Sequence, residues 1–263
     1  MHHLSDSYQL RFGGIARLYG AEALMHFSQA HFVVIGLGGV GSWVAEALAR
    51  SGIREITLID MDDVCVTNTN RQLPALASTV GQLKTEVLAN RLKDINPDIV
   101  LNIIDDFLDK PNVREYIHPE HDMVIDCIDA VLIKANLIAY CSARKIAMVT
   151  VGSAGGKKDP RLVTSSDLSR TTNDPMLSKV RQQLFKFYHF ARDKNRKFRI
   201  EAVYSTEQAV YPKPDGTVCQ QKAVSDGSVK LDCTTGFGSA TMLTGTMGFV
   251  AAERALQRYL AKR

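Results

Sequence analysis

The stretch His31-Phe32-Val33-Val34-Ile35-Gly36-Leu37-Gly38-Gly39-Val40-Gly41 decides how the rest of the chain is interpreted. Its first five residues are apolar and mostly β-branched, which predicts a short buried strand. The glycines that follow have separate roles. Gly36 allows a tight turn, Gly38 lets the backbone approach phosphate oxygens, and Gly41 lets the next helix pack closely. The stretch therefore predicts a strand followed by a phosphate-binding turn.

A helix and a second strand follow this turn and end on an acid. Residues 42–51 have helical spacing of apolar side chains, and Gly52 ends the helix. The free N–H groups of its first turn favour an anion. Residues 56–59 form the second strand, and Asp60 follows about 20 residues after the glycines, where an acid binds a ribose hydroxyl. Together these elements predict a nucleotide site, although a glycine loop without a ligand is the alternative and the motif leaves the nucleotide open.

The composition fits one large α/β domain or one domain with an extension, since the chain has 263 residues. Hydrophobic content of 45% and charged content of 23% are ordinary for a soluble globular protein. A net charge of +4 allows a nucleic-acid partner without arguing for one.

The cysteines point to a reducing compartment. There are five, an odd number, and the chain shows no signal peptide, so we expect a cytoplasmic protein with free thiols. None forms a Cys-x-x-Cys pair, which makes a structural zinc site of that spacing unexpected. The cysteines are Cys65, Cys127, Cys141, Cys219 and Cys233.

The segment 234–252 is rich in glycine and alanine and could be scored as a membrane span. Threonines and a serine make it only weakly apolar. We therefore expect a buried helix of the globule or of a dimer interface, which opens near Cys233, rather than membrane association.

Strands and helices alternate through the first half of the chain, which predicts a doubly wound, mainly parallel sheet of the Rossmann-like type. The further strands expected are 99–104, 123–129 and 147–151, and the further helices are 80–96, 111–117 and 130–145. The pattern changes after residue 155. We expect residues 1–155 to form a nucleotide-binding domain with a helical arm at 8–24, and residues 156–263 to form an α+β extension packed on it.

Polar residues gather where strands end, at the edge of the sheet where ligands bind in open α/β folds. The irregular segment after Asp60 contains Asn68 and Arg71, which can reach nucleotide phosphates. Lys84 lies in the first turn of the helix expected at 80–96, where a cation is unfavourable unless an anion lies nearby. Asp129 ends another strand, where a carboxylate can hold Mg²⁺ against phosphates. For Asp126, a role as a turn or capping acid is equally open.

The second half offers weaker signals. Residues 175–192 predict a helix, and the basic segment 192–199 after it is either a solvated helix end or an RNA-backbone contact. Residues 212–230 predict a long polar loop that contains Cys219. The arginines Arg11 and Arg17 on the arm are either solvated or reach a phosphate, the latter across a dimer.

The combined motifs resemble the ThiF/MoeB/HesA group, the relatives of ubiquitin-activating enzymes. They are Gly36-x-Gly38-Gly39-x-Gly41, Asp60-x-Asp62, Asn68-x-Asn70-Arg71-Gln72, Lys84 and Asp126-Cys127-x-Asp129, within residues 8–155. A nicotinamide dehydrogenase shares only the glycines and Asp60.

The resemblance implies ATP, Mg²⁺ and adenylation of a carboxylate. It implies that Asp60 holds the ribose, that Asn68, Arg71 and Lys84 hold the phosphates, and that Asp129 holds the metal, which makes Arg71, Lys84 and Asp129 the catalytic set. The other implied nucleotide-binding residues are Gly36, Gly38, Gly39, Gly41, Asp62, Gln72 and Arg17. The sequence departs from the group in lacking zinc-binding Cys-x-x-Cys pairs and in the arm motif Arg-x-x-Arg, which reads Arg11-Phe12-Gly13-Gly14, so that Arg17 stands in for the second arginine.

One branch of the group is similar nearly end to end, the tRNA threonylcarbamoyladenosine dehydratases. The opening segment 11–20, the basic segment 192–199 and Cys233-Thr234-Thr235-Gly236-Phe237-Gly238 carry this resemblance. It implies ATP-dependent cyclisation of N6-threonylcarbamoyladenosine in the tRNA anticodon loop and a homodimer. It also implies a monovalent cation, Na⁺ or K⁺, and in some members a cysteine desulfurase and its sulfur-acceptor protein.

Two other functions stay open at this point. One is adenylation of the carboxyl end of a ubiquitin-like sulfur-carrier protein, and the other is a non-catalytic ATP-binding scaffold in a sulfur-transfer complex. The cyclisation itself needs no enzyme nucleophile, because the attacking group is tethered to the activated carbonyl. Cys219 and Cys233 are the alternatives for a sulfur or thioester site.

Overall fold

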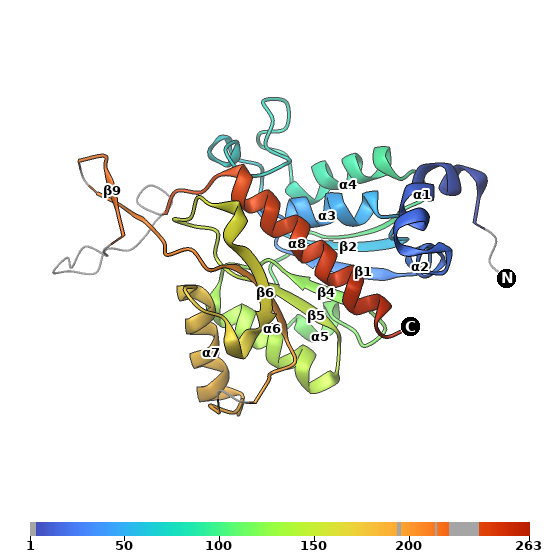
Figure 1. The fold of residues 1–263 in the computed structure, drawn as a ribbon. Helices are drawn as coiled ribbons and strands as arrows, with labels where there is room; N and C mark the ends of the chain where they lie inside the picture. Colours follow the sequence, from blue (N-terminus) through green and yellow to red (C-terminus); the bar gives the residue numbers. More distant parts are fainter. Residues whose placement is uncertain (1–3, 194–195, 214, 221–236) are drawn as a thin grey trace.

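A seven-stranded sheet organises the fold in the computed structural model, which describes residues 4–193, 196–213, 215–220 and 237–263 (Figure 1). The strand order is β3-β2-β1-β4-β5-β7-β6, and every strand is parallel to its neighbours except β6, which pairs antiparallel with β7. The strands are β1 (His31–Ile35), β2 (Glu55–Ile59), β3 (Val100–Ile104), β4 (Met123–Asp126), β5 (Met148–Val151), β6 (Val163–Asp167) and β7 (Glu201–Ser205).

Helices cover both faces of this sheet, so the predicted doubly wound α/β fold is confirmed. The α-helices are α1 (Asp6–Tyr19), α2 (Ala21–Phe27), α3 (Gly41–Arg50), α4 (Lys84–Ile95), α5 (Val113–Tyr116), α6 (Val131–Arg144), α7 (Pro175–Phe187) and α8 (Thr241–Leu260). The short elements are the 3₁₀ turns η1 (Val66–Asn68), η2 (Pro160–Leu162) and η3 (Leu168–Arg170), and the hairpin strands β8 (Tyr211–Pro212) and β9 (Val218–Cys219).

The apolar run of β1 fills two separate cores because successive side chains of a strand point to opposite faces. Phe32 and Val34 join the core under α3, α4 and α8, which lie side by side in Figure 1. Val33 and Ile35 join the core under α5, α6 and α7. All four side chains are buried. A strand buried on both faces is what a continuous apolar run predicts for a parallel sheet.

The strand order reverses beside β1, which positions the candidate site. From β1 the chain adds β2 and β3 on one side, and β4 and the later strands on the other. Ile35, the last residue of β1, is the register partner of Asp126, the last residue of β4. In open α/β sheets, ligands bind outside the carboxyl ends of the strands at this switch point.

Helix α8 is the buried helix that the sequence predicts, but its bounds differ. It begins at Thr241 and ends at Leu260, whereas Cys233, the expected start, lies outside the described residues. A Cβ on Gly248 would lie 2.7 Å from Cβ of Trp43 and 2.8 Å from the carbonyl oxygen of Val40, so the small residues let α8 approach α3. None of the described helices combines the length and apolar character needed to cross a membrane.

Four other predicted elements are wrong in extent, each for a local reason. Helix α4 begins at Lys84 rather than at 80, and Gly81 before it has φ +86°, outside the helical region. The arm is two helices, because Gly20 between them has φ +97°, outside the helical region. Helix α7 ends at Phe187 rather than at 192, and His189 just beyond has φ +58°. The loop expected at 212–230 contains a hairpin in its described part, where Tyr211 pairs with Cys219.

A histidine cluster at the amino edge of the sheet predicts acid sensitivity. The buried ring of His121 lies 4.6 Å from that of His31, and its Nδ1 accepts a hydrogen bond from the N–H of His118. Burial lowers the pKa of His121 to about 4 from 6.5, and the charges of His31 and His118 act in the same direction against Glu120 and Glu55. Below pH 6.5 the unfolded chain therefore takes up a proton that the folded chain does not.

We expect the free energy of unfolding to fall by on the order of 1 kcal/mol between pH 7 and pH 5 through this histidine alone. Urea unfolding at the two pH values measures the loss, which His121→Asn should reduce. The control is His189→Asn, since His189 is exposed and asparagine tolerates its left-handed backbone. An equal pH dependence in both variants and the parent would contradict the assignment.

Candidate functional site

The glycine turn after β1 has the conformation that its sequence predicts. Gly36 has φ +82°, and a Cβ on it would lie 3.0 Å from the carbonyl carbon of Cys127. A Cβ on Gly41 would overlap the carbonyl oxygen of Gly36, so only glycine lets α3 start this close to the turn. No side chain caps α3 at Val40. The N–H groups of Ser42 and Trp43 donate to the carbonyls of Gly38 and Val40, at 3.2 and 3.1 Å. The N–H of Gly41 has no backbone acceptor among the described residues, which leaves it available to an anion.

Asp60 lies against the same turn. Its Oδ2 accepts a hydrogen bond of 2.6 Å from the N–H of Leu37, and its Oδ1 accepts one of 2.8 Å from the N–H of Asp62. Burial raises the pKa of Asp60, while Lys84 and the two backbone donors oppose the shift. The acid therefore sits at the start of the turn, as its position after β2 predicts.

Lys84 begins α4 and is nearly buried, with a 4% exposed fraction. Its Nζ lies 2.7 Å from Oδ2 of Asp62, whose own side chain is 57% exposed. A lysine at a helix N-terminus is favourable when an anion lies nearby, and here that anion is the carboxylate of Asp62. The sequence pattern does not reveal this partner. The pair places a cation and an anion together beside Asp60.

The segment 68–72 folds over the glycine turn. Oδ1 of Asn68 accepts a 3.0 Å bond from the N–H of Cys65, which closes η1. Nη1 of Arg71 donates to the carbonyl of Thr67 at 2.9 Å and to Oδ1 of Asn70 at 3.0 Å, so Arg71 is held by neutral acceptors. A guanidinium held this way keeps further donors for an anionic ligand.

Two contacts bring Arg71 and Gln72 to the turn itself. A Cβ on Gly39 would lie 3.4 Å from Cγ of Arg71, and a Cβ on Gly38 would lie 3.7 Å from Nε2 of Gln72. The Oε1 atom of Gln72 is buried without a hydrogen-bond partner among the described residues. A buried amide oxygen of this kind has an unmet need for a donor.

The start of α8 holds this segment in place, and the sequence gives no hint of it. Thr241 donates through both its N–H and its hydroxyl to the carbonyl of Asn70, at 3.0 and 2.7 Å. Oγ1 of Thr244 donates to the carbonyl of Arg71 at 3.2 Å, and Nδ2 of Asn70 donates to the carbonyl of Ser239 at 2.7 Å. These contacts join segments far apart in the chain, so no local pattern could reveal them.

The two acids after β4 have different environments. Asp126 is fully buried, 2.9 Å from Nζ of Lys134, and accepts from the hydroxyl of Thr150 at 2.7 Å and the N–H of Ile128 at 3.1 Å. It is a structural acid that fixes the loop, which decides the alternative left open above. Asp129 is exposed at the switch point, and its carboxylate makes no hydrogen bond or ion pair with any described residue.

Among the predicted site residues, Arg17 lies away from the glycine turn. It lies on α1 over Gly13 and Gly14 of its own helix. On the same helix, Arg11 donates to the carbonyl of Ile95 at the end of α4, and Tyr8 donates to the carbonyl of Gly52 after α3. Helix α1 therefore lies at the amino edge of the sheet, opposite the glycine turn, and Arg17 cannot reach a nucleotide in its own chain.

The described thiols fall into two kinds. Burial raises the pKa of both Cys127 and Cys141 to about 12, so these thiols stay protonated. Cys65 is exposed at η1, and the hydroxyl of Thr67, which donates to its Sγ at 3.2 Å, lowers its pKa. Cys219 lies in β9, away from the glycine turn in sequence, and Cys233 lies outside the described residues.

Three comparisons bear on what this geometry does. Residues 13–262 match the model of the ThiF family. The chain is 51% identical over 259 residues to the tRNA threonylcarbamoyladenosine dehydratase of Escherichia coli (strain K12), covering 98% of this chain and 97% of that protein.

The fold is similar to two crystal structures of the E. coli tRNA N6-threonylcarbamoyladenosine dehydratase, TcdA. The complex with ATP has a TM-score of 0.88 at 46% identity and covers 99% of this chain and 98% of the other. The complex with AMP has the same TM-score and identity and covers 100% and 99%.

Proposed function

The chain belongs to the ThiF family, and on that premise we propose that it uses ATP to dehydrate N6-threonylcarbamoyladenosine in the anticodon loop of tRNA. The observation that supports this most strongly is the match to a dehydratase of the same activity over the full length of both chains, the C-terminal part included. The site supports it independently, because Asp60 and Arg71 contact the glycine turn at the switch point, and the charge of Lys84 acts on Asp60.

The proposed reaction has two steps. The carboxylate of the threonylcarbamoyl group attacks the α-phosphorus of ATP, which forms an acyl adenylate and releases pyrophosphate. The carbamoyl group of the same nucleoside then attacks the activated carbonyl, closes a ring and expels AMP. Because attacker and target are tethered, the second step gains from proximity and needs no nucleophile from the protein.

The cationic residues of the site would stabilise the negative charge that develops during the reaction. In the first step negative charge builds on the phosphates. The N-terminus of α3 opens at the turn where those phosphates would bind, and the Arg71 side chain passes Gly39 of this turn at Cγ. The ammonium of Lys84 lies beside Asp62 and its charge acts on Asp60, so both cations would oppose the phosphate charge. Asp60 would accept hydrogen bonds from the ribose, and the amide of Gln72 would complete its unmet hydrogen bonding on the nucleotide.

Mg²⁺ belongs to this proposal, and the residues fit it. Mg²⁺ is usually held by one or two carboxylates together with substrate phosphates. Within the described ranges no group of three acidic, histidine or cysteine side chains could hold a metal alone, but the unpaired carboxylate of Asp129 lies at the switch point. Asp129 would hold the ion, which when bound neutralises phosphate charge.

We expect Asp129→Asn to lower the rate of AMP formation at least about tenfold and to raise the Mg²⁺ concentration for half-maximal rate. The measurement is a Mg²⁺ titration of AMP release with saturating ATP and tRNA. The control is Asp105→Asn, a similar loss of charge on the loop after β3. An unchanged Mg²⁺ dependence of Asp129→Asn would exclude it as the ligand.

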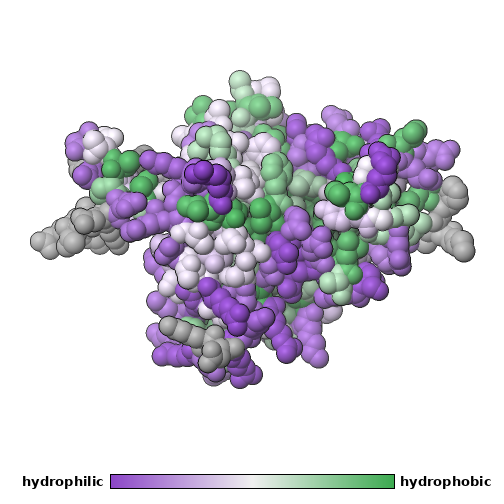
Figure 2. Space-filling view, viewed as in Figure 1, coloured by the Kyte–Doolittle hydropathy of each residue, from purple (hydrophilic) through white to green (hydrophobic). Residues whose placement is uncertain are grey.

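A homodimer would give Arg17 a role. On the same helix, Leu10 and Leu18 are 87% and 75% exposed, which suits a surface covered by a second copy. Apart from these leucines, Figure 2 shows hydrophobic and weakly polar residues in the middle of the face that α8 crosses. In the proposed dimer, Arg17 of one copy reaches the nucleotide of the other.

Mixing two inactive variants tests this arrangement. Arg17→Ala and Lys84→Met are each expected to be inactive, but a mixed dimer would contain one site with both residues intact. We expect recovery of roughly a quarter of the wild-type rate of AMP release after the two are co-refolded or co-expressed. No recovery, with mixed dimers shown to form, would contradict a role in trans.

The remaining predicted partners stay part of the proposal. They are a monovalent cation, Na⁺ or K⁺, a cysteine desulfurase with its sulfur-acceptor protein, and a cytoplasmic location where the thiols remain reduced. The split into a nucleotide-binding part at 1–155 and a part for tRNA and dimer contacts at 156–263 belongs here too.

The proposed function is tested by incubating the protein with ATP and tRNA that carries threonylcarbamoyladenosine. Mass spectrometry of the digested tRNA should show the modified nucleoside lighter by one water, together with one AMP per nucleoside converted. AMP release that needs a small Gly-Gly carrier protein and no tRNA would overturn the proposal.

A further inference from the structure

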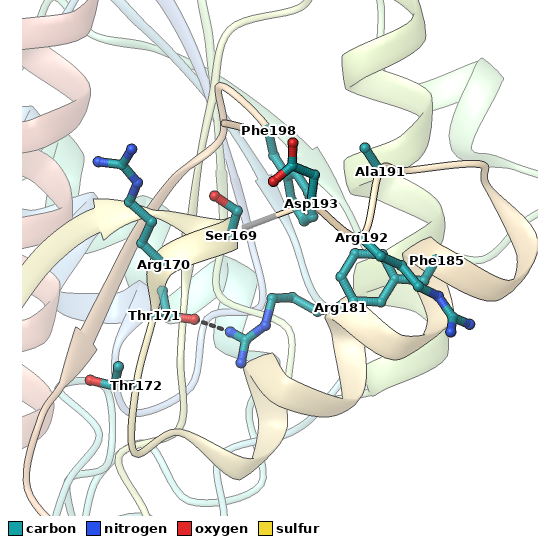
Figure 3. Close-up of a pocket in the computed structure, with 10 residues that line it drawn as sticks. All are labelled: Ser169, Arg170, Thr171, Thr172, Arg181, Phe185, Ala191, Arg192, Asp193 and Phe198. Atoms are coloured by element: carbon teal, nitrogen blue, oxygen red, sulfur yellow. Dashed lines mark hydrogen bonds between the residues drawn. The ribbon is translucent and has the colours of Figure 1, made fainter. Parts of the chain in front are cut away.

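A charged cavity of about 430 Å³ lies between η3 and α7, apart from the glycine turn (Figure 3). We name it the η3–α7 pocket. Three arginines line it, Arg170, Arg181 and Arg192, against a single acid, Asp193. Ser169 and Thr171 add hydroxyl groups. The lining therefore carries a net positive charge and several hydrogen-bond donors, which suits an anionic ligand.

The walls of the pocket are fixed by one carboxylate. Oδ1 of Asp167 accepts hydrogen bonds from the N–H and hydroxyl of Ser169, at 3.0 and 2.7 Å, and from the N–H of Phe198 at 2.9 Å. Its Oδ2 accepts one of 2.7 Å from the N–H of Arg199. Asp167 thus ties η3 to the segment 198–199 on the other side of the pocket, so the cavity is formed before any ligand arrives.

Arg181 is the central cation of the pocket. Figure 3 shows it reaching from α7 toward Thr171, and its guanidinium donates to the hydroxyl of Thr171 and, at 3.4 Å, to the carbonyl of Leu168. Both acceptors are neutral. Burial lowers the pKa of Arg181, and the charge of Asp174 opposes this shift. The carboxylate of Asp174 is already used elsewhere, because it accepts hydrogen bonds from two backbone N–H groups and lies 3.7 Å from Nζ of Lys157. A half-buried guanidinium that contacts no carboxylate of the described residues favours an anion.

Arg170 and Arg192 extend the positive charge to the exposed rim. The guanidinium of Arg192 lies 5.8 Å from the ring centroid of Phe185, which also lines the pocket. Arg192 is also the first residue of the basic segment 192–199 of the sequence, which the proposed reaction leaves unexplained. Arginine beside an aromatic ring is a common arrangement for RNA, where it takes a phosphate and a neighbouring base.

The pocket is far from the nucleotide turn. Asp167, the last residue of β6, pairs with Glu201, the first residue of β7, so η3 lies at the amino edge of the sheet. The glycine turn lies at the carboxyl edge, beyond strands of five residues, which are about 17 Å long. A ligand that bridges both places must be extended, as a tRNA is.

We propose that the η3–α7 pocket binds a backbone phosphate of the tRNA substrate, at a distance from the nucleoside that is modified. The inference rests on the proposed function, because it takes tRNA as the substrate. It assigns Arg181, Arg170 and Arg192 to tRNA binding, and gives them no part in the chemistry of ATP.

The test is the dependence of initial rate on tRNA concentration for Arg181→Gln. We expect its KM for tRNA to rise about tenfold, while kcat and the KM for ATP stay unchanged. The salt dependence of tRNA binding, measured by fluorescence anisotropy, should lose about one unit of slope in log Kd against log salt. The double variant Arg170→Gln/Arg192→Gln alters only exposed side chains and should show the same pattern with an intact fold.

The control is Arg161→Gln, an exposed arginine near the opposite end of β6 whose charge is paired with Asp159 at 2.7 Å. Its KM for tRNA should match the wild type. If the pocket variants keep the wild-type KM for tRNA and the wild-type salt slope, the pocket does not bind tRNA. The proposed function would still hold in that case, as long as the wild-type protein turns over tRNA. A wild-type protein without tRNA turnover would instead refute the proposed function.

Discussion

Replacing Lys84 by methionine is expected to lower the kcat for AMP formation by at least about 100-fold with the fold intact. Lys84 is almost buried at the start of α4. Its ammonium lies 2.7 Å from Asp62, and its charge acts on Asp60, which contacts the glycine turn. Charge that builds on the phosphates would lose a cation that is already in position. Methionine keeps the length and apolar contacts of the stem, and Asp62, left without its partner, is exposed enough to be hydrated. Single-turnover AMP release with saturating ATP measures the loss.

The matched control is Lys93→Met in the last turn of the same helix, whose Nζ contacts only a backbone carbonyl among the described residues. Its rate should stay within about twofold of the wild type. Arg71→Ala should lower AMP release to a similar degree as Lys84→Met. A near-wild-type rate for Lys84→Met, with its thermal midpoint unchanged, would show that the phosphates bind elsewhere.

Alanine at Gly41 and at Gly38 should separate folding from nucleotide binding. The methyl group of Gly41→Ala would overlap the carbonyl oxygen of Gly36, so the turn must shift. We expect a loss of stability of about 1–3 kcal/mol and at least about 100-fold weaker ATP binding. The methyl group of Gly38→Ala meets only the amide of Gln72, at an ordinary 3.7 Å. That variant should keep its stability but still bind ATP poorly, because the backbone can no longer approach phosphate oxygens.

Urea unfolding and calorimetric titration with ATP measure the two effects. A Gly38→Ala protein that binds ATP as well as the wild type would contradict the assigned phosphate position. A Gly41→Ala protein as stable as the wild type would contradict the geometry of the turn.

Much of the fold follows from local sequence because the signals are local. The apolar run 31–35, the glycines and Asp60 are linked by a single strand, turn and helix, whose geometry leaves few alternatives. Alternation of strands and helices then fixes a wound sheet, and strand ends with polar residues fix the edge where Asn68, Arg71 and Asp129 lie.

The features that the sequence could not predict depend on tertiary contacts. The ion-pair partner of Lys84 is Asp62, which lies 22 residues earlier in the sequence. The hydrogen bonds from Thr241 and Thr244 to the backbone carbonyls of the segment 70–71 join distant parts of the chain. The arm motif predicts Arg17 as a phosphate ligand, and because α1 packs at the amino edge, only the nucleotide of a second copy remains for it. No spacing rule specifies on which edge of a sheet a helical arm will lie.

The most direct test of the central claim, that this site activates a carboxylate by adenylation, follows one oxygen atom. The substrate is tRNA whose threonylcarbamoyl carboxylate carries heavy oxygen, incubated with ATP and the protein. Because the carboxylate oxygen attacks the α-phosphorus and leaves with AMP, the account predicts one heavy oxygen in each AMP released. Unlabelled AMP alongside dehydrated tRNA would contradict the adenylate route.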